Sequence, residues 1–173
     1  MKKILLISED YIKTNSGLND NVWGKYIAPT IITTQDIDLQ RVLGSSLYRE
    51  ILSMVKDGRI RNSDFSIYKT LLDDYISNYL LYQTLTNLIP VISTKITNMG
   101  VVTTSDEHIT NLSQAERDIV IGQYQKYADA YCKMLQDFLK ENRTQFKELD
   151  CCGEAELNSS ATIGLFLGGI RTK

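Results

Sequence analysis

The feature that most constrains the fold of this chain is a helix break without a linker, within residues 25–50. Apolar residues with helical spacing approach Gly44 and stop there. Ser45 and Ser46 follow directly, and serine is a residue type that starts helices. The segment therefore predicts two helices that meet at a rigid corner. It has no group arranged for catalysis, so it indicates a role in assembly.

The composition favours a single domain made of residues 1–173. A chain of 173 residues with 43% hydrophobic content is long enough for one good core, because a domain of this size buries roughly 70% of the surface of its unfolded chain. The 19 Lys and Arg residues and the 21 Asp and Glu residues give a net charge of −2. The basic residues are spread along the chain, so the sequence predicts neither a nucleic-acid groove nor a surface for anionic membranes.

The sequence also lacks the signals of a secreted or membrane protein. The apolar run of residues 4–7 is shorter than the roughly 7 to 15 residues of a signal-peptide core. No apolar run approaches the ~20 residues of a membrane span. Three cysteines, two of them adjacent at Cys151 and Cys152, form neither a disulfide framework nor a zinc motif. We therefore expect synthesis in a reducing cytoplasm, with no membrane contact.

Helical spacing of apolar residues predicts about four main helices within residues 20–149. Pro29 lies inside the first helix, which either bends or begins there. Gly58 is expected to cap the second helix, Ser63 to start the third, and Ser113 with Glu116 to form a capping box at the start of the fourth. The expected ranges are about 20–42, 46–57, 63–90 and 113–142.

The predicted fold class is all-α, a helical bundle with extended arms at both ends. The N-terminal arm comprises residues 1–19, the helical core residues 20–149 and the C-terminal arm residues 150–173. Between the third and fourth helices, we expect residues 91–97 to continue as a kinked helix and residues 101–111 to form a polar loop. The arms leave room for short β pairing.

The C-terminal arm carries apolar side chains that need a partner. Residues 161–170 hold five large apolar residues among three glycines, and glycine costs a helix roughly 1 kcal/mol relative to alanine. Burying the five contributes on the order of 10 kcal/mol, but fixing ten residues of backbone costs roughly 10 to 20 kcal/mol. The arm therefore needs strand pairing with a neighbour and copies held side by side. The predicted subunit or partner interface is Ile4, Leu5, Leu6, Ile7, Ile163, Leu165, Phe166, Leu167 and Ile170.

Several short strings occur in an order that resembles the head-to-tail connector (adaptor, neck ring) proteins of tailed bacteriophages, most closely those of crAss-like phages. The resemblance covers roughly residues 4–149 and rests on element order together with these strings rather than on a diagnostic motif. The strings are DYIK (10–13), KYIAPTI (25–31), QD (35–36), LG followed by LY (43–48), DGRI (57–60) and a long Tyr-rich helix after them.

The resemblance implies a structural virion protein without enzyme activity or cofactor. It implies a ring, taken as a dodecamer, that docks on the portal protein at the neck of the virion and binds other neck or tail proteins. Genomic DNA would pass through its lumen without sequence-specific binding. A closed ring requires a heterologous contact, in which one face of a subunit meets a different face of the next.

Two other functions stay open at this point. The first is a cytoplasmic helical binding or adaptor module of a phage or its host. The second is an all-α, magnesium-dependent nucleotide hydrolase, but Asp73 and Asp74 point about 100° apart on a helix and no Glu-x-x-His motif occurs. His108, the one histidine, lies in a polar loop without a nucleophile context, and Cys132 reads as a small buried apolar residue. No catalytic, cofactor-binding or metal-ligating residue is predicted.

The tyrosines allow two interpretations, an interface role and core packing. Tyrosine is enriched at protein interfaces because it combines a large contact area with a polar tip. Tyr75, Tyr79, Tyr127 and Tyr131, however, lie on helical stripes. We expect these four to pack in the core or at its edge.

Overall fold

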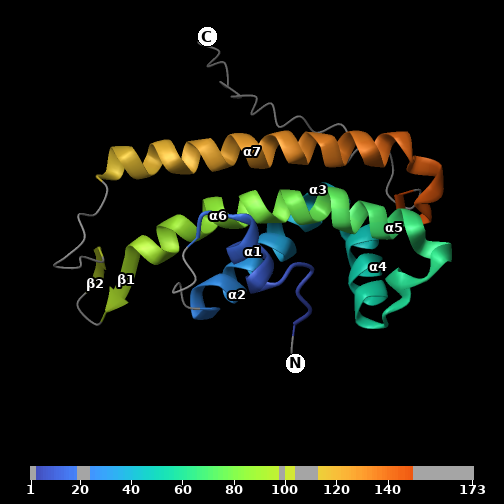
Figure 1. Ribbon diagram of the computed structural model, residues 1–173, viewed down its shortest axis with the longest axis horizontal. Helices are drawn as coiled ribbons and strands as arrows, with labels where there is room; N and C mark the ends of the chain where they lie inside the picture. The colour runs from blue at the N-terminus through green and yellow to red at the C-terminus, as the bar shows by residue number, and fades with distance from the viewer. Residues whose placement is uncertain (1–2, 19–23, 98–99, 104–112, 150–173) are drawn as a thin grey trace, which may run out of the picture.

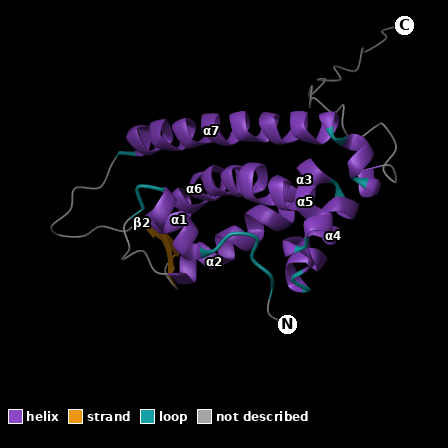
Figure 2. Ribbon diagram, turned by 45° about the vertical axis from the view of Figure 1, so that its right-hand side comes forward, coloured by secondary structure: helices purple, strands orange, loops and turns teal. Residues whose placement is uncertain are grey.

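The structure is a computed structural model, and it describes residues 3–18, 24–97, 100–103 and 113–149. The described residues form helices together with one short β-hairpin (Figures 1 and 2). The predicted all-α class is confirmed. The C-terminal arm, with its five predicted interface residues, lies outside the described residues.

The α-helices are α1 (Glu9–Asn15), α2 (Gly24–Thr33), α3 (Gln40–Leu43), α4 (Ser45–Lys56), α5 (Ser66–Thr70), α6 (Ser77–Ser93) and α7 (Gln114–Glu141). π-Helical segments join α2 to α3 and α5 to α6, and they are Thr34–Leu39 and Leu71–Ile76. Short 3₁₀ turns occupy Arg59–Arg61, Ser63–Phe65, Arg143–Gln145 and Lys147–Leu149. The strands β1 (Thr94–Thr97) and β2 (Gly100–Thr103) pair antiparallel.

The helices pack in three layers, as Figure 1 shows. The long helix α7 forms the outer layer and runs antiparallel to α6, its most extensive neighbour. The rod made by α5 and α6 forms the middle layer. Helices α1, α2 and α4 lie on the side of this rod that faces away from α7 (Figures 1 and 2). The helix α6 is therefore covered from two sides.

The core lies between these layers. Ile27 and Ile31 of α2 are spaced four apart, Leu80 and Leu88 of α6 are spaced eight apart, and both spacings return to the same face of a helix. These four side chains, together with Leu135 of α7, are fully buried. Burying a leucine or isoleucine side chain contributes about 1.5 to 3 kcal/mol. The apolar spacing that predicted the helices thus also marks their buried faces.

The predicted corner is present at Gly44. This residue has φ 76° and ψ 156°, a region of backbone space that glycine occupies far more easily than any other residue. Its N–H donates to the carbonyl of Gln40 at 2.9 Å and closes α3. The helix α4 begins at the next residue, Ser45. The predicted cap at Gly58 is also confirmed, since Gly58 is left-handed with φ 72°.

The two prolines lie inside helices. Pro29 lies within α2, and the π-helical segment Thr34–Leu39 follows that helix. Pro90 lies within α6, which continues past it to Ser93, in line with the expected continuation of the third helix beyond Pro90. A proline removes one backbone donor, and near the end of a long, packed helix that loss does not outweigh the packing.

Two local predictions need correction. The predicted kinked helix over residues 91–97 ends at Ser93, and Thr94–Thr97 form β1, because β-branched residues favour extended backbone. Ser63 does not cap the third helix directly. It begins the 3₁₀ turn Ser63–Phe65, and α5 starts only at Ser66. By contrast, the capping box of Ser113 and Glu116 is present at the start of α7.

Candidate functional site

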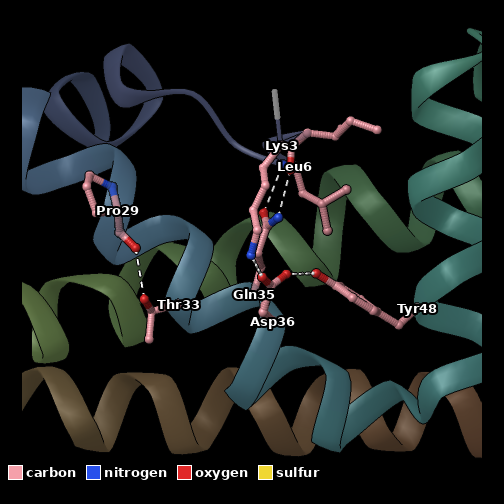
Figure 3. A network of polar contacts seen from close by, with 8 residues as sticks. Lys3, Leu6, Pro29, Thr33, Gln35, Asp36 and Tyr48 are labelled. Carbon is pink, nitrogen blue, oxygen red and sulfur yellow. Dashed lines mark hydrogen bonds and ion pairs between the residues drawn. The ribbon is translucent and has the colours of Figure 1, made fainter. Parts of the chain in front are cut away.

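A buried glutamine fastens the N-terminal segment to the helical body. Gln35 is 1% exposed and lies in the π-helical segment Thr34–Leu39. Its side-chain Nε2 donates to the carbonyl of Ile4 at 2.7 Å, and its Oε1 accepts from the N–H of Leu6 at 3.2 Å. Figure 3 shows this amide between the N-terminal segment and the helix. Both ends of the amide are therefore satisfied by backbone groups.

We call these two bonds the clamp at Gln35. Asp36, the next residue, forms a polar network around this clamp. Its carboxylate accepts hydrogen bonds from Lys3 and from the Tyr48 hydroxyl, the latter at 2.5 Å (Figure 3). Burial acts to raise the pKa of Asp36, but the bonds from Lys3 and Tyr48 outweigh burial and lower it. Burial and the bond to Asp36 raise the pKa of Tyr48. The network joins the N-terminal segment to α4.

The N-terminal residues of the predicted interface thus pack against the helical body of their own chain. Ile7 is 5% exposed and belongs to the core, which leaves little of its side chain for a partner. The assignment of Ile7 to an interface therefore needs correction, because this segment folds back onto the body through Gln35. Leu5 and Leu6 pack partly against the core, and Ile4 is half-buried. The other predicted interface residues, Ile163, Leu165, Phe166, Leu167 and Ile170, lie outside the described residues.

A groove of about 460 Å³ lies between α2 and α6, and we call it the α2–α6 groove. Its polar part is already paired, since Asn87 Nδ2 donates to Asp38 at 3.1 Å and to Thr34 at 3.0 Å. Its apolar part includes Ile37, 61% exposed, and Val91, 41% exposed. The lining residues are Lys25, Tyr26, Pro29, Thr30, Thr33, Ile37, Asp38, Asn87 and Val91.

A second apolar surface runs along α7. Val120, Tyr127 and Met134 are spaced seven apart, which places them on one side of the helix. They are 36%, 43% and 52% exposed, and Ile119 beside them is 72% exposed. We call these four residues the α7 ridge. Such a row of exposed large apolar side chains is a candidate interaction surface.

The tyrosine prediction is correct for three of the four residues. Tyr79 is buried, Tyr75 stacks on Phe138 with centroids 4.2 Å apart, and Tyr131 stacks on Tyr82 at 5.3 Å. Tyr127 also reaches Tyr82, at 5.2 Å, but keeps 43% of its surface exposed. Tyr127 therefore belongs to the α7 ridge rather than to the core.

Two of the remaining residues that could carry chemistry, Asp73 and Cys132, lie within the described residues. Asp73 forms an ion pair with Lys69 at 3.4 Å. Cys132 is half-buried, and burial raises the pKa of its thiol. Within the described ranges, no group of three or more His, Cys, Asp and Glu residues could hold a metal ion. His108 and the pair at Cys151 lie outside those ranges.

In the part of the chain that the structure describes, no helix is both long enough and apolar enough to cross a bilayer.

A protein-family model matches more than half of the chain. A model named DUF6712, described as a family of unknown function, matches residues 39–158. The chain belongs to the DUF6712 family. The match begins just before the corner at Gly44 and includes α4 to α7, so the DUF6712 region holds the α7 ridge and the α6 side of the groove. The N-terminal segment and α2 precede it. No curated protein and no solved structure matches the chain.

Proposed function

We propose that this chain is a structural virion protein, a subunit of the head-to-tail connector ring of a tailed phage. The ring docks on the portal protein, links the capsid to the tail and lets the genomic DNA pass. One observation carries the proposal. Among the described residues, the exposed large apolar side chains gather on two unlike surfaces, the α2–α6 groove and the α7 ridge.

Two unlike apolar surfaces are what a ring subunit needs. A heterologous contact joins one surface of a copy to a different surface of the next, and it generates a ring when the rotation closes. Rigidity of the subunit supports closure of the ring, because a flexible subunit gives a variable rotation between one copy and the next. The corner at Gly44 and the clamp at Gln35 supply that rigidity. The order of sequence strings around this corner is the source of the phage assignment.

The test is the mass of the purified full-length chain, measured by light scattering after gel filtration, alone and with the portal protein of the same phage. Twelve copies of a 19.7 kDa chain (12 × 19.7) give about 236 kDa. The expected result is ring-sized particles whose share of the sample rises with concentration or on addition of portal. A strict monomer that ignores the portal contradicts the proposal.

The second candidate is a helical binding module that holds one partner, and the α2–α6 groove favours it. A concave site with an apolar rim and a few fixed polar groups is the usual form of a binding site. In the same experiment this function gives a monomer at every concentration. The two candidates are therefore separated by one measurement.

A further inference from the structure

We propose that the α7 ridge of one copy packs into the α2–α6 groove of the next copy. The proposal rests on the ring function and names the contact that would build the ring. The two surfaces together hold the exposed large apolar side chains of the described residues, namely Ile37, Val91, Ile119, Val120, Tyr127 and Met134. Each of these six side chains keeps at least 36% of its surface exposed within its own copy.

The ridge and the groove face different sides of the molecule. Tyr127 of the ridge contacts Tyr82, with centroids 5.2 Å apart. Val91 of the groove follows Tyr82 on α6 by nine residues, which places it about 180° around that helix at 3.6 residues per turn.

Helix geometry then separates the two surfaces. The ridge residue Tyr127 therefore contacts the side of α6 that lies opposite the groove residue Val91. A copy therefore cannot fill its own groove with its own ridge. The partner that carries the matching ridge is a second copy of this chain, offset around the ring.

The ridge is a row of side chains on one helix, and the groove lies between two helices, so the contact resembles helix-in-groove recognition, in which a helix lays its apolar face into an apolar groove. Ile37 and Val91 offer the groove an apolar rim. The Asn87 amide donates a hydrogen bond to the Asp38 carboxylate. An apolar helix that enters the groove therefore leaves this hydrogen bond in place.

The size of the contact predicts how the chain assembles. The ridge from Ile119 to Met134 is about 22 Å long at 1.5 Å per residue, and a helix is about 10 Å wide. It covers on the order of 200 Å² per copy, well below the ~800 Å² per partner of a stable interface. We therefore expect this contact to be the apolar centre of a wider interface, and assembly to depend on concentration or on the portal.

Two substitutions in the full-length chain test the contact. Met134→Lys places a charge on the ridge and leaves the groove intact, whereas Ile37→Glu places a charge in the groove and leaves the ridge intact. The two side chains are 52% and 61% exposed, so circular dichroism should show the wild-type fold. Thr70→Lys and Thr144→Glu make the same charge changes at exposed positions outside both surfaces and serve as matched controls.

Analytical ultracentrifugation is run at concentrations where the wild-type chain assembles, with portal if portal is required. Each surface variant alone should be monomeric, and both controls should assemble. An equal mixture of the two surface variants should form only 1:1 dimers, because Ile37→Glu supplies the one intact ridge and Met134→Lys supplies the one intact groove. Rings formed by either variant, or homodimers of one variant, overturn the contact and leave the ring function standing. A wild-type chain that stays monomeric with portal overturns the ring function itself.

Discussion

Replacing Gln35 by methionine tests whether the N-terminal segment is held by the buried amide. Methionine has nearly the same length and volume but neither donates nor accepts a comparable hydrogen bond. The substitution removes the bond to the Ile4 carbonyl at 2.7 Å and the bond from the Leu6 N–H at 3.2 Å. It therefore isolates the polar contribution of Gln35, because the buried volume changes little.

The magnitude follows from these two bonds. A hydrogen bond within a protein contributes about 1 kcal/mol to stability, so the loss is about 2 kcal/mol. For a chain of this length, each kcal/mol lowers the melting temperature by about 2 to 4 °C, which gives a fall of about 4 to 8 °C.

Urea unfolding and amide hydrogen exchange measure the effect. If the segment opens locally, 2 kcal/mol corresponds to about 30-fold faster exchange of the Leu6 amide. Gln145→Met is the control, because Gln145 is exposed and its bond to Asn142 lies on the surface, so its effect should stay within about 0.5 kcal/mol. Wild-type stability of Gln35→Met, together with wild-type exchange at Leu6, would refute the reasoning.

Three other predictions concern the corner, the pH dependence and the C-terminal arm. Gly44→Ala should destabilise the chain by about 1 to 3 kcal/mol in urea unfolding, because alanine is strained at φ 76°; Gly122→Ala, in the open middle of α7, should stabilise it by up to about 1 kcal/mol. Because the pKa of Asp36 is lowered in the folded chain, its contribution is present above the unfolded pKa of about 4 and is lost as the pH falls through the lower folded value. Asp36→Asn should therefore flatten the acid side of the stability profile, and an unchanged acid limb would contradict this. Deleting residues from Asn158 onward should leave the circular dichroism spectrum nearly unchanged and weaken assembly, whereas unfolding of the truncated chain would show that the arm belongs to its own core.

Two features that the sequence predicted correctly are encoded by adjacent residues. A glycine followed by two serines is enough to specify the corner at Gly44, and Ser113 with Glu116 is enough for the capping box of α7. In both cases the backbone groups to be satisfied and the side chains that satisfy them lie within a few residues. Tertiary context has little to add at such positions.

The clamp at Gln35 could not be predicted, because its partners lie 29 and 31 residues earlier in the chain. A polar residue in the midst of an apolar pattern gave only the weak signal that its amide needs partners when buried. The hairpin was missed for another reason. The segment from Thr94 to Thr97 is too short for periodicity to separate a strand from the end of a helix.

The α7 ridge shows the limit of periodicity on a long helix. Tyr127 and Tyr131 are four residues apart and read as one stripe, yet Tyr131 stacks at the core edge and Tyr127 lies 43% exposed. The spacing of Val120, Tyr127 and Met134 was present in the sequence as a second row. Spacing alone does not say which row faces the core, because that depends on where α6 lies.

The most direct test of the ring and its contact is single-particle electron microscopy of the full-length chain, alone and with portal. The account predicts a closed ring in which α7 of each copy lies between α2 and α6 of the next, with Tyr127 and Met134 covered. Isolated single copies under both conditions, or a ring whose α7 ridges face solvent, would contradict it.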